Sequence, residues 1–120
     1  MPKERESLTD RLSRYREITI SVTARKSGRT ISNPVWFVYD DNKLFLLPVQ
    51  GSDTQWYKNV VENPKLHVAA RDASADFRAV PITDPAQVSV VVDKFRAKYG
   101  AGDVKKYYSK FDVAVSVQIS

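Results

Sequence analysis

The 120-residue sequence contains no cysteine, which excludes disulfide bonds, thiolate nucleophiles and metal sites built on cysteine. This absence fits a reducing compartment. Histidine is almost absent as well, since His67 is the only one. Without a second histidine or a cysteine, a zinc site or a facial-triad iron site is not expected, and we predict no bound metal. No serine lies in a nucleophile elbow, so a Ser-His-Asp triad has little support.

The sequence also lacks long apolar runs. No stretch approaches the roughly 20 apolar residues that a membrane helix needs. The charged residues 1–6 have no apolar run behind them, unlike the start of a signal peptide. We therefore expect a cytoplasmic protein without a membrane span.

The few glycines form no known nucleotide-binding pattern, because neither Gly28 nor Gly51 belongs to a Walker or Rossmann motif. If the protein is an enzyme, a cofactor should therefore carry the chemistry.

Basic residues outnumber acidic ones in this sequence. The net charge is +5, from 19 basic and 14 acidic residues, which favours an anionic partner such as a phosphorylated ligand, a nucleic acid or a membrane surface.

The hydrophobic pattern predicts one domain with a mainly β fold. Hydrophobic residues make up 42% of the chain, enough for one core. Alternating or short continuous apolar runs predict six strands, and helical spacing predicts four helices. The predicted strands are residues 18–24, 35–39, 44–47, 66–70, 77–82 and 111–119, and the predicted helices are residues 4–15, 54–62, 85–99 and 103–110. We expect an antiparallel β-barrel with flanking helices at residues 16–120, preceded by an N-terminal helical segment at residues 1–15.

A basic turn follows the first predicted strand. It consists of Arg25, Lys26, Ser27, Gly28 and Arg29, the densest group of cations without acidic neighbours. Glycine lets backbone amides converge on an anion, and arginine matches phosphate with two parallel hydrogen bonds. Taken alone, this composition suits a phosphate-binding turn and a solvated hairpin turn about equally well.

A second candidate anion site is the stretch from Gln50 to Tyr57, in which a Gly-Ser loop opens the predicted helix at residues 54–62. The first amides of a helix lack backbone partners and can bind an anion. The simpler interpretation is an ordinary helix start, capped by Ser52 or Asp53.

Aromatic residues supply the remaining candidates. Trp36 and Phe37 lie on opposite faces of a predicted strand, so one of them could stack on a flat ring while the other enters the core. A hydroxyl of Tyr107 or Tyr108 could donate a proton to a substrate, although packing is the commoner role for tyrosine.

The order of these motifs resembles the deazaflavin (F420)-dependent nitroreductase family. That family belongs, with the pyridoxamine 5'-phosphate oxidases, to a split-barrel superfamily of flavin and deazaflavin oxidoreductases. The resemblance covers roughly residues 16–119 and rests on the basic turn, the Asn33-Pro34 segment, the hairpin after it, and the motifs at residues 55–59 and 62–64. It implies a six-stranded antiparallel split β-barrel with flanking helices, usually a homodimer. It also implies an oxidoreductase that transfers a hydride from reduced F420 to a small-molecule electron acceptor, such as a quinone, a nitroaromatic compound or an activated alkene.

The resemblance further implies a cofactor site. The basic turn would contact the phosphate tail, residues 33–37 would lie along the ring system, and the loop at residues 48–52 would close the other side. The implied cofactor-binding residues are Arg25, Lys26, Ser27, Gly28, Arg29, Asn33, Pro34, Val35, Trp36, Pro48, Val49, Gln50, Gly51, Ser52 and Trp56. Tyr107 or Tyr108 would face the substrate as the catalytic residue.

One residue departs from the family pattern. Gln50 stands where members that bind deazaflavin well often carry a lysine. The missing cation weakens the case for a long anionic tail and leaves FMN as the alternative cofactor. A non-catalytic protein that binds a cofactor or a hydrophobic ligand is a further alternative. Binding of single-stranded nucleic acid is not expected, because the aromatic residues follow an apolar pattern.

Overall fold

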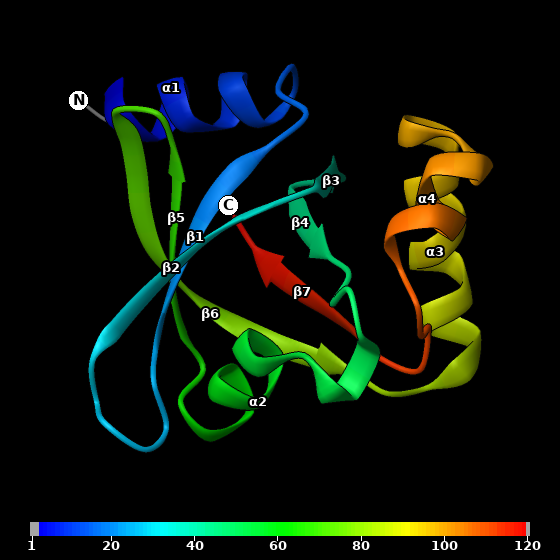
Figure 1. Ribbon diagram of the computed structural model, residues 1–120. Helices are drawn as coiled ribbons and strands as arrows, with labels where there is room; N and C mark the ends of the chain where they lie inside the picture. Colours follow the sequence, from blue (N-terminus) through cyan, green and yellow to red (C-terminus); the bar gives the residue numbers. More distant parts are fainter. Residues whose placement is uncertain (1–2, 120) are drawn as a thin grey trace.

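The computed structural model describes residues 3–119, so residues 1–2 and 120 of the two predicted units lie outside the described part. Within it, seven antiparallel strands form one curled sheet in the order β2-β1-β5-β6-β7-β4-β3 (Figure 1). The strands are β1 (Ile18–Thr23), β2 (Thr30–Val35), β3 (Phe37–Asp40), β4 (Lys43–Leu46), β5 (Lys65–Ala70), β6 (Ala73–Ile82) and β7 (Ala114–Gln118). The predicted fold class, an antiparallel split barrel with flanking helices, is confirmed, with one strand more than the six expected.

The additional strand is β2, which pairs with β1 from Ile18↔Val35 to Thr23↔Thr30. Most of its side chains are exposed and it contains Pro34, so it has no apolar alternation that a sequence pattern could reveal. Proline is tolerated there because β2 is an edge strand, and one side of an edge strand needs no ladder hydrogen bonds.

The predicted strand at residues 35–39 is divided between two strands. The chain leaves β2 at Val35, passes Trp36 and enters β3 at Phe37. Because β2 and β3 are the two edges of the sheet, this one segment runs from one edge to the other and bridges the opening of the barrel (Figure 1). Trp36 therefore lies at the junction between the two edges.

The helices are α1 (Lys3–Leu12), α2 (Gln55–Glu62), α3 (Pro85–Tyr99) and α4 (Ala101–Tyr107), with a short 3-10 helix η1 (Gly51–Asp53) before α2. Helix α1 ends before its predicted limit, and α4 both begins and ends earlier than predicted. The N-cap position of α2 is Thr54, not Ser52 or Asp53 as predicted. Asp84 caps α3, where its carboxylate accepts a hydrogen bond of 3.1 Å from the amide of Gln87.

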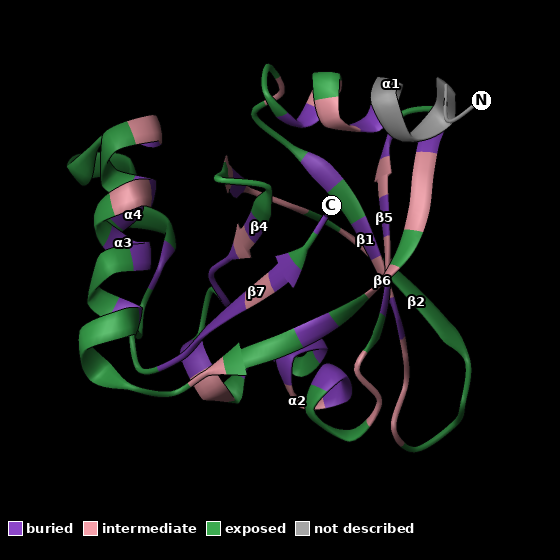
Figure 2. Cartoon of the chain, turned by 180° about the vertical axis from the view of Figure 1, so that it is seen from behind, coloured by how far each residue is buried: buried purple, intermediate pink, exposed green. Residues whose placement is uncertain are grey.

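Buried side chains form two hydrophobic clusters. The larger fills the barrel, where buried residues such as Ile20, Leu66 and Val117 alternate with exposed or half-buried ones. Figure 2 shows buried and more exposed positions following one another along the strands. The smaller lies under α3 and α4 and includes Phe95 and Tyr108. In the described chain, no helix is long and apolar enough to cross a membrane. The space between the two clusters is where the candidate site lies.

Candidate functional site

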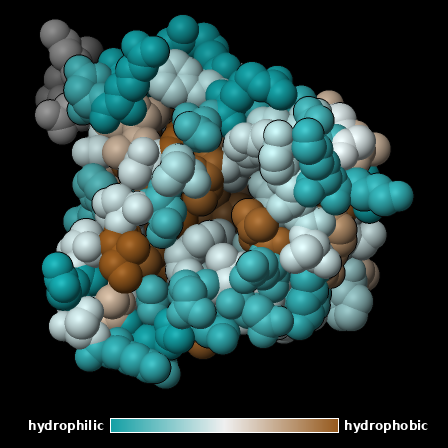
Figure 3. Space-filling model, in the orientation of Figure 1, coloured by the Kyte–Doolittle hydropathy of each residue, from teal (hydrophilic) through white to brown (hydrophobic). Residues whose placement is uncertain are grey.

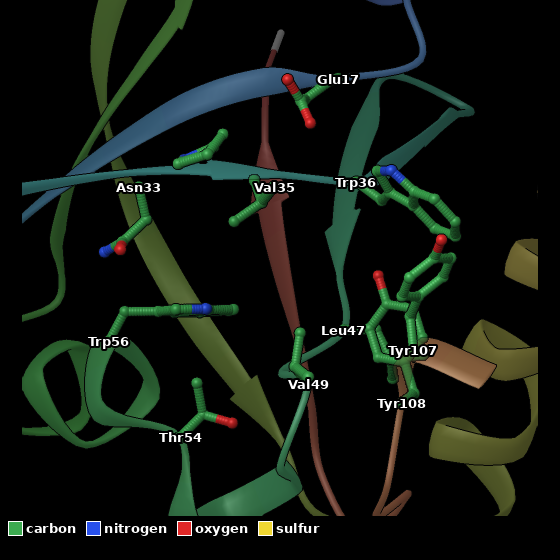
Figure 4. A pocket seen from close by; sticks show the side chains of 11 residues that line it. Glu17, Asn33, Val35, Trp36, Leu47, Val49, Thr54, Trp56, Tyr107 and Tyr108 are labelled. Carbon is green, nitrogen blue, oxygen red and sulfur yellow. The ribbon is translucent and has the colours of Figure 1, made fainter. Parts of the chain in front are cut away.

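A groove of about 480 Å³ lies between the barrel, the start of α2 and the end of α4. Its lining residues are Glu17, Asn33, Pro34, Val35, Trp36, Leu47, Val49, Thr54, Trp56, Tyr107 and Tyr108 (Figure 4). In the orientation of Figure 1, the molecular surface is hollowed near its centre, with apolar side chains around the hollow (Figure 3). The volume and the largely apolar lining are typical of a small-molecule or cofactor site.

The residues around Trp36 form an aromatic wall at one side of the groove. The indole stacks on the ring of Tyr99, with 4.2 Å between centroids and 8° between planes. The ring of Tyr107 meets Trp36 edge-on at 5.3 Å, and that of Tyr108 lies 6.1 Å away. Stacked and edge-to-face pairs of this kind are favourable arrangements of aromatic rings. The orientation of Trp36 is therefore fixed by its neighbours.

The last turn of α3 holds this wall in place. The hydroxyl of Tyr99 accepts a hydrogen bond from the amide of Phe37 at 3.0 Å, and it lies 2.7 Å from the carbonyl oxygen of Arg16, to which it can donate. The ammonium of Lys98 donates to the carbonyls of Tyr15 and Phe37 at 2.9 and 2.8 Å. These bonds fasten the chain next to Glu17 and next to Trp36, and both of those residues line the groove.

Burial shifts the acidity of both α3 residues. It raises the pKa of Tyr99 to about 12, because the phenolate would lose its solvation. It lowers the pKa of Lys98 to about 8, and the nearby positive charge of Arg16 lowers it further. At neutral pH, Tyr99 is therefore a neutral hydrogen-bonding group and Lys98 is a cation whose charge is disfavoured by burial.

The two candidate catalytic tyrosines differ in their exposure. Tyr107 lines the groove and is 51% exposed, whereas Tyr108 is buried and its ring meets Phe95 at 6.0 Å. Burial raises the pKa of Tyr108, and the proximity of Tyr99 adds to the effect. Tyr108 therefore belongs mainly to the core under α3, and Tyr107 is the more exposed of the two tyrosines that line the groove.

The basic turn lies beside α2 and outside the residues that line the groove. The guanidinium of Arg25 donates to the side-chain oxygens of Asn59, at 2.8 Å, and of Gln55, at 3.1 Å. Gln55 directly precedes Trp56, so the turn adjoins the Trp56 end of the groove. Because Asn59 is buried, Arg25 also satisfies a polar group of the interior.

The other cations of the turn are open to solvent. Lys26, Ser27, Gly28 and Arg29 are all exposed, and Gly28 takes a positive φ of 73° that closes the turn. Among residues 3–119, no ion pair involves Lys26 or Arg29. No acidic side chain of the described residues therefore neutralises these two charges.

The loop at residues 48–52 already holds an anion, which is the carboxylate of Asp112. Ser52 donates to it from its amide, at 2.9 Å, and from its hydroxyl. A side chain on Gly51 would collide with Asp112, because its Cβ would lie 2.1 Å from Oδ1. Burial acts to raise the pKa of Asp112, but the two bonds from Ser52 and the charge of Lys110 outweigh it and lower the pKa.

The structure thus separates the predicted cofactor-binding residues into three groups. Those in the groove are Asn33, Pro34, Val35, Trp36, Val49 and Trp56; those in the adjoining turn are Arg25, Lys26, Ser27, Gly28 and Arg29; those in the loop behind the groove are Pro48, Gln50, Gly51 and Ser52. Sequence reasoning did not single out Glu17 or Leu47, and it included Thr54 only in the stretch around the helix start; all three also line the groove. Thr54 was recognisable as a residue at the helix start, whereas Glu17 carries no signal in the sequence.

The curled sheet and the groove between barrel and helices define a split-barrel protein. The same fold occurs in an F420-H2 dependent reductase (FDR-A), with 20% identity and a TM-score of 0.65 over 85% of this chain and 93% of that one. It also occurs in HutZ, the heme storage protein of Vibrio cholerae (13% identity, TM-score 0.71, 94% and 87% covered). A third example is a putative pyridoxamine 5'-phosphate oxidase from Listeria innocua (12% identity, TM-score 0.68, 94% and 90% covered).

At these identities the similarity establishes the fold alone. The family follows from the sequence itself, because residues 9–117 match the model of the family described as "Uncharacterized protein conserved in bacteria (DUF2255)". The chain belongs to that family. The predicted split-barrel relationship is therefore confirmed at the level of the fold.

Proposed function

We propose that the protein binds a flavin-type cofactor in the groove and transfers a hydride to a small-molecule electron acceptor. F420 is the first candidate cofactor, and the acceptor would be a quinone, a nitroaromatic compound or an activated alkene. The observation that carries this proposal is the meeting of residues 33–36, Trp56 and Tyr107 around one apolar groove of about 480 Å³. These segments are the ones that the resemblance assigns to the ring system and the substrate.

The residues fit such a cofactor in two respects. The groove offers Val35, Val49 and Trp56 as apolar surface for a flat ring. The exposed cations Lys26 and Arg29 adjoin the Trp56 end, where they can bind a phosphate tail. Reduced F420 would supply the hydride, and the chain would supply binding, orientation and the exclusion of water. Reduction of an acceptor by hydride also requires a proton, for which the half-exposed Tyr107 is a candidate donor in the groove.

FMN remains the alternative cofactor, and one observation favours it. The loop beside the groove has Gln50 instead of a lysine, and its amide and hydroxyl donors at Ser52 are taken by Asp112. Phosphate binding is therefore confined to the basic turn, which suits the single phosphate of FMN better than a longer anionic tail.

A non-catalytic role in cofactor binding is the second candidate function. Tyr108 is buried with a raised pKa, which leaves few proton donors in the groove. Cofactor binding without turnover across a panel of acceptors would support it.

We also propose a homodimer. The outer face of the molecule near α3 exposes the apolar side chains of Val80 and Val90, at 50% and 55%. Burial of this surface against a second copy would stabilise a small domain. Light scattering of the purified protein tests the oligomeric state.

The test of the proposed function is a titration with F420, FMN and riboflavin, followed by tryptophan fluorescence. The two tryptophans of the sequence, Trp36 and Trp56, both line the groove, so a bound ring should quench them. Lys26→Ala and Arg29→Ala should each weaken FMN or F420 binding by about threefold to fivefold, as expected for exposed ion pairs. Riboflavin, which lacks the phosphate, should bind equally well to all variants.

Arg78→Ala is the matched control, because Arg78 is an exposed arginine on β6 that does not line the groove. It should leave every affinity unchanged. Failure of F420 and FMN alike to bind would refute the proposal. Equal losses in Lys26→Ala and Arg78→Ala would refute the phosphate site in the turn.

A further inference from the structure

The groove has a charge of one sign only. Of the eleven residues that line it, Glu17 alone carries a charge, although the chain as a whole is basic. Glu17 is exposed, directly precedes β1 and borders the cavity on the side opposite Thr54 and Val49 (Figure 4). A ligand at this border therefore meets a carboxylate.

The cations near Glu17 belong to Arg16, Arg71 and Lys98, and each interacts with another group. The guanidinium carbon of Arg71 lies 5.8 Å from the centre of the Tyr15 ring. The guanidinium carbon of Arg16 lies 5.0 Å from the centre of the Tyr99 ring, over its face. The ammonium of Lys98 donates to the backbone carbonyls of Tyr15 and Phe37. In the part of the chain that the structure describes, no ion pair involves Glu17. Its carboxylate is free to face a ligand.

The aromatic wall adds a second feature that suits positive charge. Trp36 and Tyr107 meet edge to face at 5.3 Å, and Tyr108 completes the same side of the groove (Figure 4). The face of an aromatic ring carries partial negative charge, and tryptophan attracts cations most strongly. Rings of this kind together with a carboxylate are the elements with which proteins recognise quaternary ammonium ligands.

We propose that the end of the groove formed by Glu17, Trp36, Tyr107 and Tyr108 binds an organic cation, either a quaternary ammonium group or a ring with delocalised positive charge. A primary ammonium is less suitable, because it is compact and strongly hydrated. The inference depends on the proposed function in one respect, which is that the cofactor occupies the Trp56 end of the groove and leaves this end to the cation. If both hold, the electron acceptor is a cationic compound, and an anionic acceptor is disfavoured by Glu17.

The test uses three probes of the same shape: choline, its neutral carbon isostere dimethylbutanol, and the anionic dimethylbutyrate. Their binding to the protein without added cofactor is followed by tryptophan fluorescence. Choline should bind about tenfold more tightly than dimethylbutanol, as cation–π contact with an ion pair predicts, and dimethylbutyrate should bind most weakly. Equal affinities for the cationic and the neutral probe, with or without binding of the anion, would overturn the proposal.

Three variants test which residues cause the preference for choline over the neutral probe. Glu17→Gln should weaken choline binding by about fivefold and leave dimethylbutanol unchanged, because only the charge is removed. Glu62→Gln, which removes an exposed carboxylate at the end of α2 outside the groove lining, should have no effect. Trp36→Leu should reduce the preference for the cation, and Trp56 still reports binding. Equal losses in Glu17→Gln and Glu62→Gln would overturn the site.

This test and the cofactor titration fail independently. A protein that binds neither F420 nor FMN but prefers choline retains the cation site and loses the proposed oxidoreductase function. A protein that binds a cofactor but treats the three probes alike retains the proposed function and loses the cation site.

Discussion

The aromatic wall and the basic turn stand at opposite ends of the candidate site, and the protein holds them in different ways. Trp36 is stacked on Tyr99, which in turn is bonded to the backbone of Phe37 and Arg16. The turn at residues 24–29 is fastened to α2 mainly by one side chain, that of Arg25, while its other cations face solvent.

This difference predicts how substitutions at the two ends should affect the protein. The wall shares its residues with the buried cluster under α3 and α4, so a change there should affect folding and binding together. The exposed cations Lys26 and Arg29 contribute little to the core, so replacing either should leave the free energy of unfolding nearly unchanged. The candidate site therefore combines an aromatic wall supported by the core with a turn whose remaining cations are open to solvent.

The largest effect should come from removing the support of the wall. Tyr99 is buried, stacks on Trp36 and meets Phe95 at 5.9 Å. Tyr99→Ala should lower the free energy of unfolding by about 3–5 kcal/mol, because it leaves a cavity and removes hydrogen bonds. Tyr107→Ala, at the exposed side of the same wall, should cost less than about 1 kcal/mol. Urea denaturation of both variants checks this, and similar losses would show that Tyr99 is not the support.

A smaller difference in stability is expected between glycine substitutions in the loop behind the groove and in the basic turn. Gly51 and Gly28 both have positive φ, at 56° and 73°. A Cβ at Gly28 meets no atom within 4 Å, whereas one at Gly51 would collide with Asp112. Gly28→Ala should cost about 1 kcal/mol from backbone strain alone. Gly51→Ala should cost about 2–3 kcal/mol, since Asp112 must also leave Ser52.

Denaturation midpoints of the two glycine variants give the comparison directly. Asp112→Asn provides the control, because it weakens the bonds to Ser52 without adding a Cβ. Combined with Gly51→Ala, it should cost less than the sum of the two single changes. Equal costs for Gly51→Ala and Gly28→Ala would mean that Asp112 moves away freely.

Much of the fold could be predicted because its signals are local. The alternation in β1, β5 and β7 reflects one buried and one exposed face, and residues two apart in sequence are enough to reveal it. Strand β2 could not be found in this way, because an exposed edge strand that contains Pro34 has no such alternation. Its pairing is decided by contact with β1, which is a tertiary effect.

In the candidate site, too, residues with local sequence signals could be predicted, and residues that depend on tertiary contacts could not. Asn33, Trp36 and Trp56 belong to motifs whose order in the sequence resembles a known family, and the structure brings them to one groove. Asp112 could not be found, because its partner Ser52 is distant in sequence and the carboxylate has no motif around it. Glu17 is similar, since its importance depends on which cations nearby are directed away from it.

The smallest predicted effect concerns the pH dependence of the wall. The pKa of Lys98 is lowered from 10.5 to about 8 in the folded protein, because burial and the charge of Arg16 disfavour the ammonium. Between these two pH values the unfolded chain binds more protons than the folded one, so the free energy of unfolding should rise with pH. Because Lys98 is partly open to solvent, the rise should be on the order of 1 kcal/mol.

Lys98→Met tests this prediction, since it preserves the length of the side chain and removes the titrating group. Tyr99 acts in the opposite direction above pH 10, because its pKa is raised to about 12 and the unfolded chain loses that proton first. Urea denaturation should therefore be compared between pH 8 and 10, where the Lys98 contribution is separate. The difference in stability between the native sequence and Lys98→Met should change in favour of the native sequence as the pH rises. Parallel curves would mean that burial does not disfavour the ammonium of Lys98.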